Sequence, residues 1–293
     1  MRNNFKTVVL MATLGALFVG VGQLIGGTGG ATTALVIAGL MNFAMYFFSD
    51  KIALAGARAK AVEEHELPQV YQIVRSLAQR QDLPMPKIYL IDSPQPNAFA
   101  TGRNPSHAAV AVTTGIVALM DHAELEGVLA HELSHVRNRD ILIASVAATV
   151  AVALSFLVRI AFWTGMGNDR RENNPVSAVV GILAIILAPL AAMVIQMAIS
   201  RSREYEADRS GAEMTGSPLT LARALARLEE GTSRIPMQVD PSTAQLFIAD
   251  PLKAFGRRGS GGMGGMTRMF STHPPIAERI ARLEEMAQGG LIR

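Results

Sequence analysis

The hydrophobic positions along this chain fall into two patterns: long apolar runs, and segments with helical or strand spacing. From Thr7 to Ser49 there is no Asp, Glu, Lys or Arg, a pattern that neither a solvated loop nor an amphipathic helix would tolerate. A membrane-spanning helix needs about 20 predominantly apolar residues. Four runs meet this requirement: Thr7–Ile25, Ala31–Ser49, Ile141–Trp163 and Val176–Ser200.

These runs form two pairs, and each pair predicts a transmembrane hairpin. The Gly-rich segment 26–30 joins the first two, and Pro189 is expected to kink the fourth. One such run alone would also fit the core helix of a soluble protein. The first would fit a signal peptide, because Arg2 and Lys6 precede it. Two observations favour membrane spans that stay in the protein. There are four such runs, and no small-residue cleavage site is followed by a polar start of a mature chain.

Basic residues mark one side of these hairpins and so predict their orientation. They flank the apolar runs as Arg2, Lys6, Lys51, Arg58, Lys60, Arg137, Arg139, Arg201 and Arg203. Loops rich in Lys and Arg stay in the cytoplasm, so both termini and every long polar segment are expected there. The predicted organisation is a hairpin at 7–49, two parts of one cytoplasmic domain at 53–140 and 201–293, and a second hairpin at 141–200.

The polar segments predict a mainly α domain with a small β-sheet. Two strands are expected, at Lys87–Asp92 and Ala108–Thr114, with a hairpin-like connection between them. Residues 256–266 are so rich in glycine that they predict a flexible loop. Helices are expected at Leu67–Gln81, Ala123–Arg139, Arg201–Thr215, Pro218–Glu230 and Pro275–Ala287.

The composition narrows the functional classes. The chain is 49% hydrophobic and 17% charged, against roughly 25% charged in soluble domains. The net charge of +3 comes without clusters of basic and aromatic residues, so no nucleic-acid partner is expected. With no cysteine in the sequence, a thiol nucleophile and a Cys-type zinc site are excluded.

The segment His131-Glu132-Leu133-Ser134-His135 carries the clearest chemistry. Residues i and i+4 of a helix lie on one face, so the two imidazoles can bind one metal ion. Glu132, beside that ion, can act as a general base on water. The alternatives are a chance match and a pair of ordinary histidines on a helix surface. The apolar residues before the motif favour a buried His face over both.

A catalytic zinc site needs a third protein ligand, and Glu204 is the strongest candidate. It directly follows the fourth apolar run, as the HELSH helix directly precedes the third. If these runs pair as an antiparallel hairpin, their cytoplasmic ends bring Glu204 to both histidines. Asp208, one turn further, is placed to accept a ring N–H from a ligating histidine. The alternative is a helix with solvated carboxylates, and Glu206 is a weaker ligand candidate.

The strings VLAHELSHVRNRD, SREYEAD, NAFATG and THPP together resemble the HtpX branch of the membrane-bound zinc metallopeptidases of family M48. These enzymes are related to those that cleave prenylated CaaX proteins. The resemblance implies a zincin-like domain and a stress-response endopeptidase of the bacterial inner membrane. It would use one Zn²⁺ per subunit to cut misfolded or damaged membrane proteins on the cytoplasmic side.

By matching motifs, the resemblance puts the zinc ligands at His131, His135 and Glu204 and the catalytic glutamate at Glu132. It also implies that Asn97, Ala98 and Phe99 lie next to an edge strand that holds extended substrate backbone. His273 would steady the oxyanion, and Arg279 would orient a carboxylate. Structural roles are the alternative for three residues. Asn97 would form a turn, His273 would lie at the start of a helix, and Asp140 would cap a helix or pair with Arg137 or Arg139.

Two other functions fit parts of the pattern. An intramembrane protease would carry the motif inside an apolar span, but the charged segment 137–140 lies between the motif and the third span. A scaffold or metal-binding regulator with four spans would have no use for Glu132. The sequence does not identify the oligomeric state, and a His-His-Glu site also accepts other divalent ions.

Overall fold

The computed structural model describes residues 2–149, 201–239, 243–254 and 274–289. The described part is mainly helical with one small mixed sheet, which confirms the predicted fold class at this level. Its strands are β1 (Lys60–Ala61), β2 (Lys87–Ile91), β3 (Ala98–Gly102) and β4 (Ala108–Thr113). Its labelled helices are α1 (Arg2–Gly56), α2 (Pro68–Arg80), η1 (Pro105–His107), α3 (Thr114–Leu119), α4 (His122–Arg137), α7 (Arg201–Thr215), α8 (Pro218–Arg234), η2 (Ala244–Leu246) and α11 (Ile276–Gln288).

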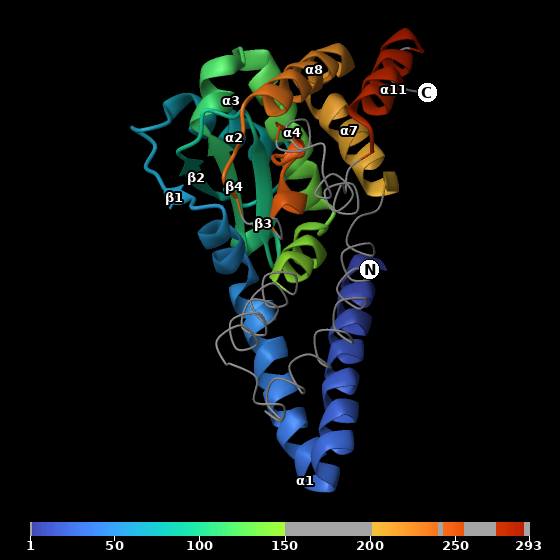
Figure 1. Ribbon diagram of the computed structural model, residues 1–293. Helices are drawn as coiled ribbons and strands as arrows, with labels where there is room; N and C mark the ends of the chain where they lie inside the picture. Colours follow the sequence, from blue (N-terminus) through green and yellow to red (C-terminus); the bar gives the residue numbers. More distant parts are fainter. Residues whose placement is uncertain (1, 150–200, 240–242, 255–273, 290–293) are drawn as a thin grey trace.

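Helix α1 is a hairpin of two helical arms, which extends away from the rest of the described chain (Figure 1). The arms meet at Gly26 and Gly27, where Gly27 takes φ 57°, a value that favours glycine. Near the turn the arms approach closely, because a Cβ atom on Gly30 would lie 2.2 Å from the Gly22 carbonyl oxygen. The second arm continues past the predicted end at Ser49.

The second arm, Gly26–Gly56, is the one helix among the described residues long and apolar enough to cross a membrane. It carries exposed apolar side chains such as Leu40, which is 67% exposed. Residues 141–149 begin the third predicted span as a helix. The rest of that span and all of the fourth lie outside the described residues.

The sheet has the order β1-β2-β4-β3. β2 and β4 are parallel, with Lys87 opposite Ala109, and β3 is antiparallel to β4, with Ala98 opposite Val112. The expected hairpin-like connection between β2 and β4 is therefore wrong. The intervening segment, which the sequence predicts only as a connection, contains β3. β4 is buried along its whole length, as is typical of a central strand covered on both faces.

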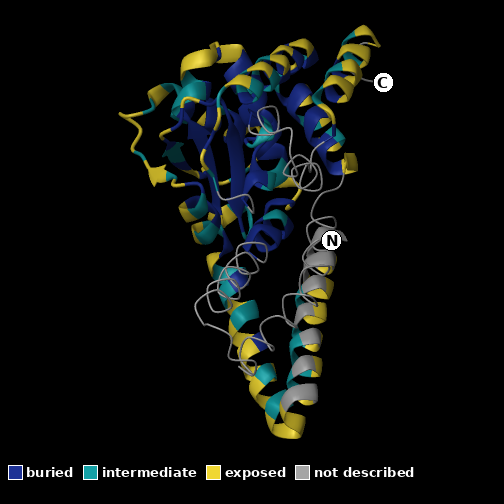
Figure 2. Cartoon of the chain, in the orientation of Figure 1, coloured by how far each residue is buried: buried dark blue, intermediate teal, exposed yellow. Residues whose placement is uncertain are grey.

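Both faces of the sheet are covered by helices, as Figure 2 indicates by the burial of the strands and of α4. On one face, side chains of the sheet such as Val110 join a core cluster with residues of α2, α4 and α8, among them Leu129 and Leu225. The other face packs on the end of α1, where Ala53 and Ala57 join a cluster with Phe99, Ala109, Ala111 and Phe247. The α1 hairpin is thus attached to the sheet directly.

Candidate functional site

Helix α4 carries the HELSH motif through the centre of the domain. It begins with a capping box: the Glu124 amide donates to Asp121 Oδ1 at 2.8 Å, and the Asp121 amide donates to Glu124 Oε2 at 3.2 Å. This reciprocal pair satisfies two of the free N–H groups at the helix start. His131 is 1% exposed and Glu132 is 2% exposed, so the motif is not a pair of surface histidines.

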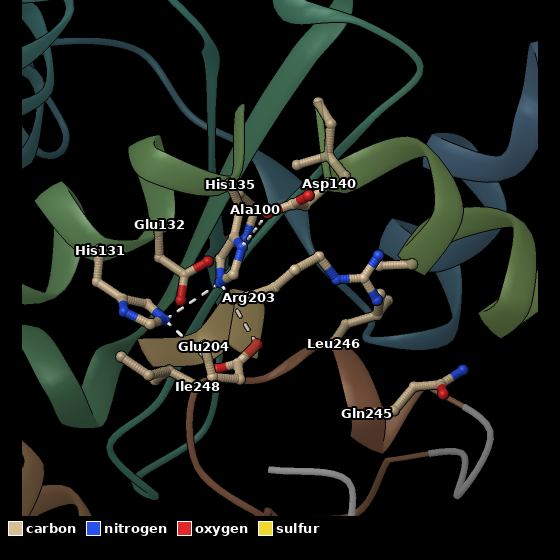
Figure 3. A pocket seen from close by; sticks show the side chains of 12 residues that line it. Ala100, His131, Glu132, His135, Asp140, Arg203, Glu204, Gln245, Leu246 and Ile248 are labelled. Carbon is tan, nitrogen blue, oxygen red and sulfur yellow. Dashed lines mark hydrogen bonds and ion pairs between the residues drawn. The ribbon is translucent and has the colours of Figure 1, made fainter. Parts of the chain in front are cut away.

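The ligand atoms of His131, His135 and Glu204 all lie within 4.8 Å of one another. The two Nε2 atoms are 3.3 Å apart. Glu204 Oε2 lies 3.8 Å from His131 Nε2, and Oε1 lies 3.6 Å from His135 Nε2. Figure 3 shows both imidazoles and the Glu204 carboxylate turned towards one another. Helix α7 therefore brings Glu204 to the α4 motif, although the two are far apart in the sequence.

These separations fit one zinc ion. Bonds of about 2.0–2.1 Å in a tetrahedral site put ligand atoms roughly 3.3–3.4 Å apart. The measured 3.3, 3.6 and 3.8 Å are close to this spacing. The donor set of two imidazoles and one carboxylate leaves the fourth position open, as in catalytic zinc sites.

Asp208 and Arg279 form a buried pair behind His131. Asp208 Oδ1 lies 3.0 Å from His131 Nδ1, which is the contact considered for it from the sequence. Arg279, on α11 and 0% exposed, donates through Nε and Nη2 to the two Asp208 oxygens at 2.8 and 2.6 Å. Such a bidentate pair fixes the carboxylate, which in turn orients the imidazole.

Burial keeps His131 neutral, and the Arg279 charge keeps Asp208 ionised. Burial lowers the pKa of His131 to about 4 and outweighs its hydrogen bond to Asp208, while Arg279 adds to the lowering. Burial alone would raise the pKa of Asp208, but attraction to Arg279 brings it down to about 2. His131 thus has the neutral form that metal binding requires.

Asp140 performs the equivalent contact for His135, a role that the sequence reading missed. Its Oδ2 atom lies 3.2 Å from His135 Nδ1, whereas the sequence reading gave it only a cap or an arginine partner. Burial alone would lower the pKa of His135, but the hydrogen bond to Asp140 and the nearby carboxylates of Glu204 and Glu132 raise it to about 9. The position of Asp140, five residues after His135 and just past the helix end, was the available signal.

Glu132 links the metal site to the edge of the sheet. Its Oε2 atom accepts a hydrogen bond of 2.7 Å from the Ala100 amide of β3. β3 is the last strand in the sheet order, so this amide points away from β4. The carboxylate that would act as base is therefore held beside the strand edge that would receive substrate.

The side chains of Asn97 and Phe99 are buried and contact other parts of the protein. Both are 0% exposed. Asn97 Nδ2 donates to the Ala249 carbonyl at 2.8 Å, and the Phe99 ring packs edge-on against Phe247 with centroids 4.9 Å apart. Ala98, also 0% exposed, accepts a hydrogen bond through its carbonyl from the Ile248 amide at 3.0 Å. The backbone of this segment is also bonded within the protein: the Asn97 amide donates to Thr113 Oγ1 at 2.9 Å and the Ala98 amide donates to Asn97 Oδ1 at 3.1 Å.

A cavity of about 50 Å³ lies over the metal-site residues. Arg203, Gln245, Leu246 and Ile248 line it opposite the histidines (Figure 3). Arg203 is another residue that the sequence reading did not single out for the site; its position directly before Glu204 was the signal. His273 and the glycine-rich segment 256–266 lie outside the described residues.

Comparison with known proteins gives consistent matches. The family model "Peptidase family M48" matches residues 64–287. The chain is 52% identical to a "Protease HtpX homolog" of Thermodesulfovibrio yellowstonii over 98% of this chain and 99% of that protein. It is 51% identical to one of Burkholderia thailandensis over 99% of each chain.

The fold is similar to that in the crystal structure of S. mikatae Ste24p, with a TM-score of 0.50 and 20% sequence identity. The match covers 93% of this chain and 62% of that one, so this chain spans less than two thirds of its length. At this identity the likeness concerns the fold alone.

Proposed function

This chain belongs to peptidase family M48, and on that premise we propose that this membrane metalloprotease is a zinc-dependent endopeptidase. The observation that supports this most directly is the convergence of His131, His135 and Glu204 within 4.8 Å, with Glu132 beside them. We propose that these three side chains hold one Zn²⁺ ion per subunit. The ion, when bound, supplies Lewis acidity for hydrolysis of the peptide bond.

Glu132 acts as the general base and then as the general acid. It takes a proton from the attacking water while the oxygen of that water bonds to the scissile carbonyl carbon. It then returns the proton to the leaving amine as the carbon–nitrogen bond breaks. The hydrogen bond from the Ala100 amide keeps the carboxylate oriented for both transfers. His273 is assigned the role of steadying the oxyanion, as the family resemblance implies.

Asp208 and Asp140 position the two histidines. Each carboxylate contacts the Nδ1 atom of one imidazole, at 3.0 Å for His131 and 3.2 Å for His135. This leaves each Nε2 atom for the metal ion. Arg279 holds Asp208 from behind through two hydrogen bonds, so the C-terminal helix α11 takes part in fixing the site.

The substrates that we propose are misfolded or damaged proteins of the bacterial inner membrane, cut on the cytoplasmic side as part of quality control and the stress response. The lipid bilayer is the other partner of the chain. The proposal includes four spans, with both termini and the catalytic domain in the cytoplasm. It is supported by the basic residues that flank the apolar runs and by attachment of the catalytic domain to the end of α1.

The decisive test is Glu132→Gln in the full-length protein, assayed on an unfolded membrane-protein substrate with the zinc content measured. Loss of proteolysis with retained zinc is expected, because the amide cannot accept the proton. The matched control is Glu126→Gln on the same helix, whose carboxylate pairs with Arg80 at 3.1 Å and whose replacement should leave proteolysis unchanged. Unchanged proteolysis in Glu132→Gln would refute the mechanism.

The third ligand and the topology are tested separately. Glu204→Ala should lower the zinc content, and full occupancy would contradict the assignment. Reporter proteins fused after Ser49 and at Asp169 should report the cytoplasm and the periplasm, respectively. A periplasmic signal after Ser49 would overturn the proposed orientation.

A further inference from the structure

We propose that this protease acts preferentially on substrates whose membrane anchor lies on the N-terminal side of the scissile bond, and that it cuts them close to the membrane surface. The inference rests on the proposed function and specifies its substrate class. It follows from the direction of β3, the residue at which the cavity meets this strand, and the distance between that residue and α1.

The first step is that β3 runs towards the membrane-facing part of α1. Arg103, directly after β3, lies over the Phe47 ring at 5.1 Å from its centroid. Phe99, near the start of β3, instead shares a cluster with Ala53 and Ala57, further along α1. The last turns of α1 and strand β3 are therefore antiparallel, and the Gly102 end of β3 is nearest the apolar part of the hairpin.

The second step is the level of the membrane surface. The uncharged stretch ends at Ser49, and Lys51 lies over the Phe48 ring at 5.3 Å. Just before it, the Phe47 ring contacts the Phe43 ring in a tilted arrangement and the Tyr46 ring edge-to-face. Aromatic side chains with basic neighbours gather at the membrane–water interface, so this part of α1 marks the cytoplasmic surface.

The third step is that the cavity meets β3 at Ala100, between the two ends of the strand. At the far end, the Ala98 carbonyl is taken by the Ile248 amide, and at the membrane end the Gly102 amide donates to Ser145 Oγ at 3.4 Å. The cavity is lined by Ile248 and also by Ile141 and Ala144, which belong to the helix that begins the third predicted span. Substrate backbone that pairs with β3 beside Glu132 therefore does so at Ala100.

The fourth step is the direction of the substrate. Antiparallel pairs are the more stable arrangement for added strands, so a bound substrate runs opposite to β3. Because β3 runs from Ala98 outside to Gly102 at the membrane, the N-terminal part of the substrate lies at the membrane. A chain anchored by a preceding transmembrane helix passes directly from the lipid into the site.

The spacing follows from strand geometry. Ala100 and Arg103 are three residues apart, which corresponds to about 10 Å at about 3.3 Å per residue. An N-terminal anchor thus needs a spacer of roughly three to five residues to reach Glu132. A C-terminal anchor requires the chain to leave past Ala98, turn and return, for which we estimate roughly twelve residues or more.

The test uses the zinc-loaded full-length protease in liposomes and two mirror-image model substrates. Both carry the same transmembrane helix and the same cleavable segment, joined by a Gly-Ser spacer of about five or about fifteen residues. The helix precedes the segment in one and follows it in the other, and the segment faces the catalytic domain in both. The unanchored segment reports proteolysis as such, and Glu132→Gln gives the background.

With the short spacer, the N-terminally anchored substrate should be cut at least about tenfold faster, because a linker that cannot span the distance gives an effective concentration near zero. With the long spacer the difference should fall to about threefold or less. Equal or reversed rates with the short spacer would overturn the inference, as would cutting of the unanchored segment alone. If the unanchored segment is also uncut, the proposed function itself fails.

Discussion

Gly211 lies where α7 crosses α4 behind the metal-site residues, and it leaves no room for a side chain. A Cβ atom at this position would lie 2.9 Å from the His131 nitrogen and 3.1 Å from its Cα atom. Carbon atoms in favourable contact are about 3.5–4.0 Å apart. Both neighbours belong to the backbone of α4, so Gly211→Ala should separate the helices by about 0.5–1 Å.

This displacement should weaken zinc binding and lower stability only modestly. Overpacking costs about 1–3 kcal/mol, but alanine recovers about 1 kcal/mol through its higher helix propensity. Metal–ligand distances tolerate only about 0.2 Å. Because α7 carries Glu204, a shift of about 0.5 Å or more should reduce zinc affinity about tenfold or more.

Competition with a chelator of known affinity measures this effect in the purified full-length protein. The matched control is Ser210→Ala, which changes the neighbouring position of α7 and should leave zinc affinity within about twofold. Native zinc affinity together with native thermal stability in Gly211→Ala would refute the close packing of the two helices.

Three further predictions concern the two histidines and the carboxylates behind them. Asp140→Asn should weaken zinc binding about 10- to 100-fold, and unchanged affinity would show that its contact with His135 does not support the metal. Asp208→Ala should destabilise the metal-free protein by about 3–5 kcal/mol, because it leaves the Arg279 charge buried without this partner. Thermal unfolding measures this loss, and a much smaller change would contradict it. Zinc must displace a proton from His135, whose pKa is raised to about 9 without metal, so affinity should rise about tenfold per pH unit from pH 7 to 9 and then level off. A flat profile in chelator competition would exclude this protonation.

Much of the site was predictable because its signals are local. The i, i+4 spacing of His131 and His135 puts both imidazoles on one face of any helix. Helix α7 ends at Thr215, as predicted from the sequence. Glu204 was predicted as the third ligand from topology, because the two ends of a hairpin lie close together whatever its internal packing.

The errors occurred where pairing over long distances decides the structure. Residues 98–102 were predicted as part of a connection and not as a strand; their sequence, AFATG, contains small residues and glycine, which carry weak strand signals. They become a strand through their pairing with β4. The pairing of Asp140 was missed for a related reason: its contact with His135 depends on a turn after α4, where Arg139 takes φ 58°.

The sequence by itself determined the apolar hairpin, the helix with the metal motif and the family, because composition, periodicity and fixed spacing act within short segments. Only the tertiary structure decided which groups hold the histidines and how the sheet edge is directed. The bidentate hold of Arg279 on Asp208 joins residues separated by 71 positions. The approach of Gly211 to His131 and the direction of β3 along α1 likewise depend on packing between elements, which no local pattern records.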